Sequence, residues 1–132
     1  DFTINAMAYN DSTGLVDEFD GINDLNKGII RCVGDAKERF TEDALRMMRA
    51  IRFSAQLGFD IEENTYNAIS KLSPSISHVS MERIQVELVK TLLSDNPGYV
   101  MRFYETGLFK YVLPDIGWRK IFKKCTYNVE IF

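Results

Sequence analysis

Residues 42–57 constrain this chain more than any other stretch, because they carry polar side chains at regular three-residue intervals. Asp43, Arg46, Arg49 and Arg52 are spaced in this way, and each step of three turns the side chain back by about 60° on a helix. The four groups would span about half the circumference, with an apolar face opposite them. Three guanidinium groups on one face repel one another unless an anion lies between them. The pattern predicts an amphipathic helix whose polar face binds a phosphate-bearing ligand.

The composition excludes several classes of function. The 132 residues are 45% hydrophobic and 27% charged, which is typical of a protein that buries a core. The net charge of -3 means that any basic site must be local. Two cysteines and one histidine give neither a disulfide framework nor a common zinc site. Without a signal peptide or a long apolar run, we expect a cytoplasmic protein with no membrane partner. Because the chain opens at Asp1, inside a dense stretch, we also expect a fragment of a longer protein.

The fold class expected from the pattern is mainly α, with a small β-hairpin near the N-terminus. Short apolar runs between turn signals predict strands at residues 15–19 and 29–33, at the edge of a sheet. Helices are expected at about residues 42–57, 61–72, 81–93 and 97–106, with Gly58 ending the first and with Asp60, Ser80 and Asn96 as N-caps of the other three. A short segment at residues 108–113 follows, and the state of residues 117–132 stays open.

Four short stretches occur in an order that one enzyme family also shows. They are residues 1–6, residues 17–21 with Asp24-Leu25, residues 42–46 with Arg49, and residues 82–84 with Glu87-Leu88. These stretches resemble successive motifs of the bacterial class II tRNA nucleotidyltransferases, the CCA-adding enzymes, and of their poly(A) polymerase relatives. The resemblance covers roughly residues 1–115. It implies that residues 1–36 end the nucleotidyltransferase head, that residues 37–107 form a helical neck, and that residues 108–132 begin a helical body.

The resemblance implies a template-independent enzyme that adds CCA to the 3′ end of tRNA, with CTP, ATP and tRNA as partners. The catalytic carboxylates of the family, which bind Mg²⁺, stand before the position of Asp1. We therefore expect no catalytic residue and no metal ligand in this chain, which would be inactive alone. Asp17, Asp20 and Asp24 cluster in the sequence. In the family their segment is a hinge-like element between head and neck, so we do not assign them to a metal.

The resemblance also assigns the polar groups of the arginine-bearing helix. Asp43 and Arg46 would recognise the base, because a carboxylate accepts from the amino group of cytosine or adenine while a guanidinium donates to the adjacent ring nitrogen. Guanine and uracil present the reverse order of donor and acceptor. We also consider Asp1 as a support for Arg46. Further nucleotide contacts, to phosphate or ribose, are expected from Arg49, Arg52, Asp1 and Asn5.

Simpler interpretations of the same residues do not need a nucleotide. Asp43 and Arg46, three residues apart, would ordinarily be a solvated ion pair worth about 0.2–0.5 kcal/mol. Glu42 is interpreted as a first-turn acid that the helix dipole stabilises. Glu82 and Arg83 are interpreted as structural residues that brace the third helix against the neck.

Two alternative functions remain open at this stage. A fragment of a bacterial poly(A) polymerase would carry the same motifs. A non-catalytic helical RNA-binding module would share the helices but have no nucleotide site.

Overall fold

The computed structural model of the chain describes residues 1–112, so the expectations for residues 113–132 fall outside the described part. Helices predominate there, which confirms the mainly α fold class. The helices are α1 (Gly21–Lys27), α2 (Ala36–Glu42), α3 (Leu45–Leu57), α4 (Glu63–Leu72), α5 (Met81–Leu92), α6 (Met101–Glu105) and α7 (Leu108–Val112). The strands are β1 (Ala8–Asn10), β2 (Gly14–Val16), β3 (Ile29–Ile30) and β4 (Asp60–Ile61). Three 3₁₀ turns are η1 (Thr3–Asn5), η2 (Ser73–His78) and η3 (Pro97–Val100).

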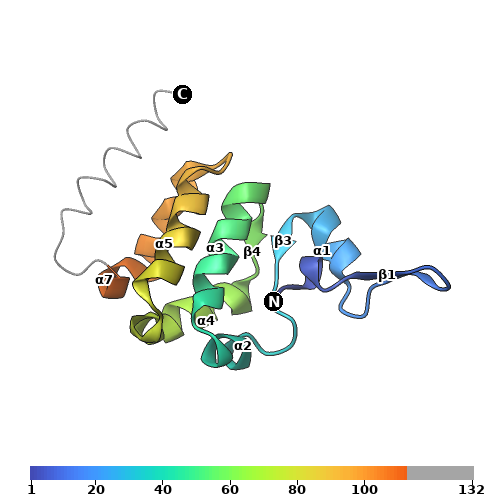
Figure 1. The fold of residues 1–132 in the computed structure, drawn as a ribbon, viewed down its shortest axis with the longest axis horizontal. Coiled ribbons are helices and arrows are strands. Elements are labelled where there is room, and N and C mark those ends of the chain that lie inside the picture. The colour runs from blue at the N-terminus through green and yellow to red at the C-terminus, as the bar shows by residue number, and fades with distance from the viewer. Residues whose placement is uncertain (113–132) are drawn as a thin grey trace.

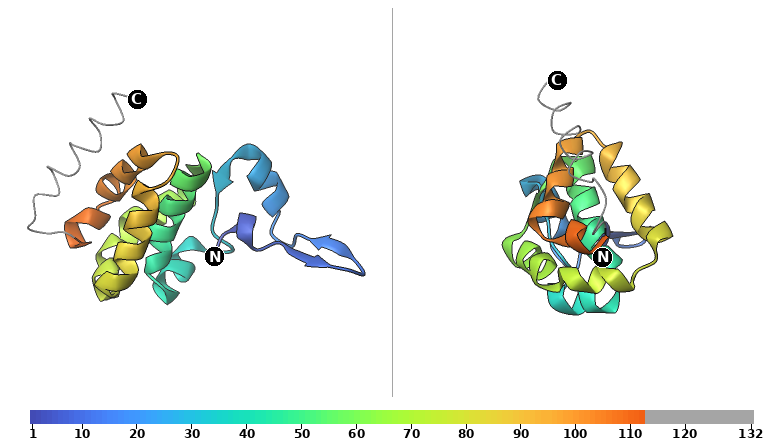
Figure 2. Two further views of the ribbon diagram at one scale, coloured as in Figure 1. Left: turned by 45° about the horizontal axis from the view of Figure 1, so that its top comes forward. Right: turned by 90° about the vertical axis from the view of Figure 1, so that its left-hand side faces the viewer.

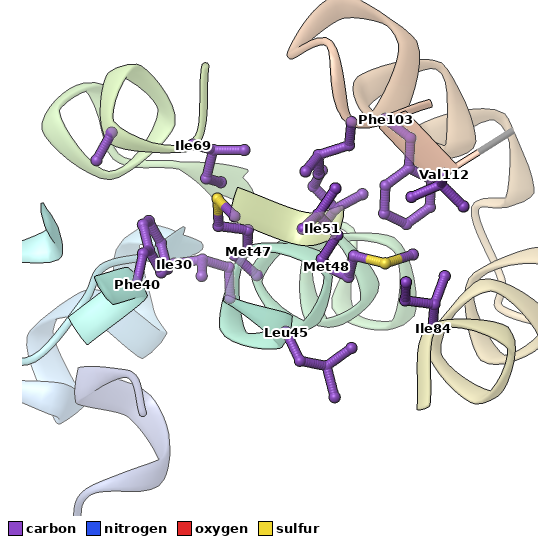
Figure 3. Close-up of a cluster of buried hydrophobic side chains, with 14 of the residues drawn as sticks. Ile30, Phe40, Leu45, Met47, Met48, Ile51, Ile69, Ile84, Phe103 and Val112 are labelled. Carbon is purple, nitrogen blue, oxygen red and sulfur yellow. The ribbon is translucent and has the colours of Figure 1, made fainter. Parts of the chain in front are cut away.

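Helix α3 lies at the centre of the helical part, with α5 packed along it (Figure 1). Its apolar face is buried as the sequence predicts, and Met47, Met48 and Ile51 have no exposed surface. In Figure 3, Met47 extends toward Ile69 of α4, whereas Met48 extends toward Ile84 of α5. One helix therefore supplies side chains to packing contacts on two sides. Truncation of a buried side chain of this size typically costs about 2–5 kcal/mol.

The arginine-bearing helix begins later than the sequence predicts. The chain breaks between α2 and α3, where Asp43 has extended backbone angles, φ −150° and ψ 105°. Its Oδ1 accepts a hydrogen bond from the backbone N–H of Leu45 at 3.1 Å. Short acidic side chains compete in this way with helical backbone bonds, which ends one helix and starts the next. Asp43 thus precedes α3, and Glu42 is the last residue of α2 rather than a first-turn acid.

The predicted hairpin of residues 15–19 and 29–33 is wrong. The hairpin of the structure is β1 with β2, antiparallel with Ala8 opposite Val16, and it projects from the rest of the chain (Figure 2). After β2 the Asp17 carboxylate accepts from the N–H groups of Gly21, at 2.7 Å, and Ile22, at 2.9 Å. These bonds begin α1, so a helix lies between the two expected strands, which do not pair with each other.

Strand β3 pairs instead with a segment that follows the central helix. Ile29 lies opposite Asp60 and Ile30 opposite Ile61, in a parallel pair. Asp60 is therefore a strand residue, and Glu62 is the N-cap of α4 in its place. The predicted caps at Ser80 and Gly58 are confirmed, whereas the Asn96 side chain donates to the carbonyl of Ala55 at 2.9 Å instead of capping a helix.

Candidate functional site

Arg46 is held by three groups from two parts of the chain. Its Nε lies 3.3 Å from Oδ1 of Asp1. Its Nη1 donates to Oε2 of Glu42 at 2.8 Å and to the carbonyl of Arg39 at 3.1 Å. These contacts come from the N-terminal segment and from the last turns of α2, so the break before α3 also brings Glu42 beside Arg46.

Asp1 joins two of the predicted arginines. One carboxylate oxygen contacts Arg46, and the other contacts Nη1 of Arg49. The Asn5 side chain accepts from the N–H of Phe2 at 2.9 Å, which fixes the turn that carries Asp1. The structure therefore brings Asp1, Asn5, Arg46 and Arg49 together at the start of α3. In this cluster a carboxylate lies between the two guanidinium groups and offsets their repulsion.

Asp43 has other partners. Its Oδ2 accepts from Nη2 of Arg83 at 2.9 Å, while its Oδ1 caps α3. Burial would raise the pKa of this carboxyl, but the bonds from Arg83 and Leu45 and the charges of Arg83 and Arg46 outweigh burial and lower the pKa. Asp43 and Arg46 do not form the solvated ion pair of the simpler interpretation, since no such pair occurs within residues 1–112.

A cavity of about 550 Å³ lies beside Asp43, large enough for a small organic group. Asp43, Arg83 and the single histidine, His78, lie on its wall. Arg46 and Arg49 do not line it. Asp43 thus lines this cavity, whereas Arg46 and Arg49 contact Asp1.

Arg52 lies apart from the other arginines. Its Nε is 2.6 Å from Oε2 of Glu87 on α5, and the two side chains are only 11% and 8% exposed. Its guanidinium carbon lies 4.2 Å from the ring centroid of Phe53. Arg52 therefore ties α3 to α5 in the interior, and its contact with a nucleotide stays a prediction.

Four residues with a part in these networks were missed or given another role by the sequence analysis: Arg39, Glu42, Arg83 and Glu87. Arg83 does brace α5 as expected, but the group that it holds is Asp43. The available signal was the four-residue spacing of Arg83 and Glu87, which puts both on one face of α5. On this face Glu87 contacts Arg52 of α3, and Arg83 contacts Asp43 just before α3.

Within residues 1–112, no group of three His, Cys, Asp or Glu side chains is arranged to hold a metal ion. None of the helices described is both long and apolar enough to cross a membrane. Asp17 and Asp24, which cluster in the sequence, have structural contacts. Asp17 caps α1, and the buried Asp24 accepts from Oγ1 of Thr3 at 2.6 Å and from Nε of Arg31 at 3.1 Å.

Two family descriptions match the chain. Residues 1–31 match the poly(A) polymerase head domain, and residues 58–118 match a domain described as the probable RNA and SrmB-binding site of polymerase A. The chain therefore belongs to the poly(A) polymerase family of nucleotidyltransferases. Within that family its relatives are CCA-adding enzymes. That of Ligilactobacillus salivarius (strain UCC118) is 53% identical over 112 residues, which are 84% of this chain and 28% of the relative.

Solved structures show the same likeness. The CCA-adding enzyme of Bacillus stearothermophilus, determined in complex with CTP, aligns with a TM-score of 0.82 and 42% identity over 85% of this chain. The Thermotoga maritima CCA-adding enzyme, determined with a tRNA, aligns with a TM-score of 0.80 and 34% identity over 87% of this chain. In each case the match covers 29% of the solved chain, so this chain spans less than a third of these relatives.

Proposed function

We propose that this chain is the nucleotide-selecting and RNA-binding part of a cytoplasmic CCA-adding enzyme, which extends tRNA with CTP and ATP. The observation that carries the proposal is the separate support of Asp43 and Arg46. Arg83 holds the carboxylate and Glu42 holds the guanidinium, so neither group neutralises the other. In this proposal residues 1–36 belong to the head, residues 37–107 form the neck, and residues 108–132 begin the body.

The two groups select bases by hydrogen-bond order. Asp43 accepts from the exocyclic amino group of cytosine or adenine, and Arg46 donates to the ring nitrogen beside it. Uracil and guanine would place a carbonyl against Asp43 and an N–H against Arg46. Either base would leave the charges of Asp43 and Arg46 without hydrogen-bond partners, so a site built on these two groups would reject UTP and GTP strongly.

The remaining groups hold the rest of the nucleotide. Arg49, with Asp1 and Asn5 beside it, is the proposed contact for phosphate or ribose. A triphosphate would compete with the Asp1 carboxylate for Arg49, because both are anions. Arg52 could contact the phosphate or ribose only after its buried ion pair with Glu87 is broken.

Magnesium is implied for the reaction by the family, since metal ions stabilise the attacking and leaving oxygens in such transfers. The described residues of this chain provide no suitable ligand set. We therefore assign no metal-dependent step to them. Their part is to bind and orient the nucleotide base.

Replacement of Arg46 by alanine in the full-length enzyme tests the proposal. Loss of a charged hydrogen bond, worth about 1.5–3 kcal/mol, should lower kcat/KM for CTP and ATP by about 10- to 150-fold. Discrimination against UTP and GTP should be lost in the same variant. Steady-state incorporation of the four nucleotides into a tRNA lacking its CCA end measures both effects. Lys90→Ala, on the exposed side of α5, is the control, and normal selectivity in Arg46→Ala would contradict base recognition by this residue.

A poly(A) polymerase is the second candidate, because both matching family descriptions name polymerase A. Product length separates the two enzymes. A CCA-adding enzyme stops after three nucleotides on a tRNA lacking its end, whereas a poly(A) polymerase makes a long adenosine tail. A non-catalytic RNA-binding module would incorporate neither nucleotide and would gain no thermal stability from CTP.

A further inference from the structure

A second cavity, of about 500 Å³, lies between the segment that follows β3 and the outer side of α4. It shares no lining residue with the cavity beside Asp43. Its wall is polar and carries both signs of charge. The residues that line it are Arg31, Cys32, Gly34, Asp35, Ala36, Lys37, Glu62, Asn64, Thr65, Asn67, Ala68 and Lys71.

The two acids of this cavity already have partners. The Asp35 carboxylate accepts from the backbone N–H of Lys37 at 3.1 Å and caps α2. The Glu62 carboxylate accepts from the N–H groups of Asn64, at 3.0 Å, and Thr65, at 2.9 Å, and caps α4. Such bonds to helix N-termini stabilise the ionised acids and engage their oxygens.

The basic and amide groups are not engaged in this way. Lys37 and Lys71 are exposed, and neither ammonium group takes part in an ion pair within residues 1–112. The side-chain amides of Asn64 and Asn67 are also exposed and make no hydrogen bond within the same range. Asn64, Asn67 and Lys71 lie three and four residues apart, so they share one face of α4. The cavity thus presents two lysine ammonium groups and two amide donors that have no partner of their own within residues 1–112. Arg31, the third cation of the lining, pairs with Glu62 at 3.7 Å.

This set of groups fits a sugar–phosphate backbone. Lysine and asparagine side chains are common donors to phosphate and sugar oxygens. No aromatic ring lines the cavity, which disfavours stacking on bases. Its apolar lining consists only of the small residues Cys32, Ala36 and Ala68, which disfavours an inserted peptide with large side chains.

The position of the cavity links it to the proposed nucleotide site. Cys32 lines the cavity and forms a β-bridge with Phe2, the neighbour of Asp1. The N–H of Val33 donates to the carbonyl of Asp1 at 3.3 Å. A single backbone segment therefore separates the cavity from the cluster of Asp1, Arg46 and Arg49. An RNA whose 3′ end reaches that cluster has its backbone within a short distance of the cavity.

We propose that this cavity binds the sugar–phosphate backbone of the RNA substrate, through Lys37, Lys71, Asn64 and Asn67, near the end that is extended. The identification of that RNA as tRNA rests on the proposed function. The phosphate chemistry rests on the cavity alone.

The test is the double charge reversal Lys37→Glu/Lys71→Glu in the full-length enzyme. Its control is Lys27→Glu/Lys90→Glu, which changes the net charge equally at exposed lysines of α1 and α5. Binding to a tRNA that lacks its CCA end is measured over a series of salt concentrations. The cavity variant should raise Kd at least tenfold and reduce the slope of log Kd against log salt by about 1.4–1.8, the loss of two phosphate contacts. The neutral variant Lys37→Gln/Lys71→Gln should give an intermediate Kd at unchanged Tm.

Equal effects of the cavity variant and its control, or an unchanged Kd in both, would overturn the proposal. If the cavity variant lost binding to another protein while its affinity for tRNA stayed unchanged, the cavity would be a protein-binding site and the proposal would be overturned. Selection of CTP over UTP should be normal in the cavity variant, because Asp43 and Arg46 are untouched. Failure of the wild-type enzyme to add CCA would instead refute the proposed function, while the tRNA binding series still reports on the cavity.

Discussion

The Asp43 side chain makes two structural contacts and keeps the capacity for a third. One oxygen caps α3 and the other accepts from Arg83. An ionised carboxylate offers about four lone-pair sites, so two hydrogen bonds leave room for an amino group of a base. With its pKa lowered from the ordinary value, this carboxyl is ionised at neutral pH, as recognition of an amino donor requires.

Replacement of Arg83 by methionine should loosen the orientation of Asp43 without unfolding the protein. The Arg83 side chain is 53% exposed, so the pair contributes less than about 1 kcal/mol to stability. We expect selection of CTP over UTP to fall by about 3- to 10-fold in Arg83→Met, with Tm nearly unchanged. Arg83→Lys, which keeps a donor, should recover part of the selectivity. Unchanged selectivity together with a lower Tm would show that Arg83 has only a structural role.

The pH dependence of stability gives a second measure of the same contact. Because the pKa of Asp43 is lower in the folded state, its contribution to stability is present above the unfolded value, about 3.8, and is lost as the pH falls through the folded value. In Arg83→Met this loss on acidification should be smaller.

At the scale of elements, the regular arginine spacing of α3 does not produce three equivalent groups. Arg46 and Arg49 turn toward Asp1, in the N-terminal segment. Arg52, one or two turns farther along, meets Glu87 of α5. The partners come from segments far apart in the sequence, so periodicity alone could not separate the one buried arginine from the other two.

The Arg52–Glu87 pair should be required for the packing of α3 on α5. Glu87→Leu leaves a buried guanidinium without its partner, and we expect it to lower the free energy of unfolding by about 3–5 kcal/mol. The double variant Arg52→Met/Glu87→Leu removes both charges and should regain most of that loss. Urea denaturation of the chain and its variants measures these values. A Glu87→Leu variant as stable as the wild type would contradict the structural role of the pair.

The sequence predicted the elements whose signals are local. The apolar face of α3, the glycine end at Gly58 and the cap at Ser80 depend on neighbours within one or two turns. The break at Asp43 was missed, because an aspartate can stand either within the polar face of a helix or at the start of one, and the spacing alone does not distinguish the two. The pairing of β3 with β4 was missed because it joins residues about 30 positions apart. For the site, the motifs indicated Asp1 and the arginines, but the Arg83 contact required the packing of α5.

In the whole molecule, the N-terminal part divides into a docked segment and a projecting hairpin. The docked segment includes β3, which pairs with β4. Arg31, which follows β3, joins α1 to the start of α4: its Nε lies 3.1 Å from Asp24, and its Nη1 lies 3.7 Å from Glu62. The β1–β2 hairpin extends away from these contacts in Figure 2. All three residues of β1 are exposed, and short isolated hairpins are marginal in water.

Amide hydrogen exchange should follow this division. We expect the slowest exchange in the buried turns of α3, where opening requires most of the core to unfold. The β1–β2 amides should exchange at least about 10³-fold faster, because the strands are three residues long and open without loss of the core. Peptides that contain β3 and β4 should show matching intermediate rates, since each strand protects the other. Timed labelling of the intact chain, followed by digestion under quench conditions and mass spectrometry of the peptides, measures all three classes. Protection of the hairpin equal to that of α3 would contradict this division and would mean that another surface, such as a second copy of the chain, covers its unpaired edges.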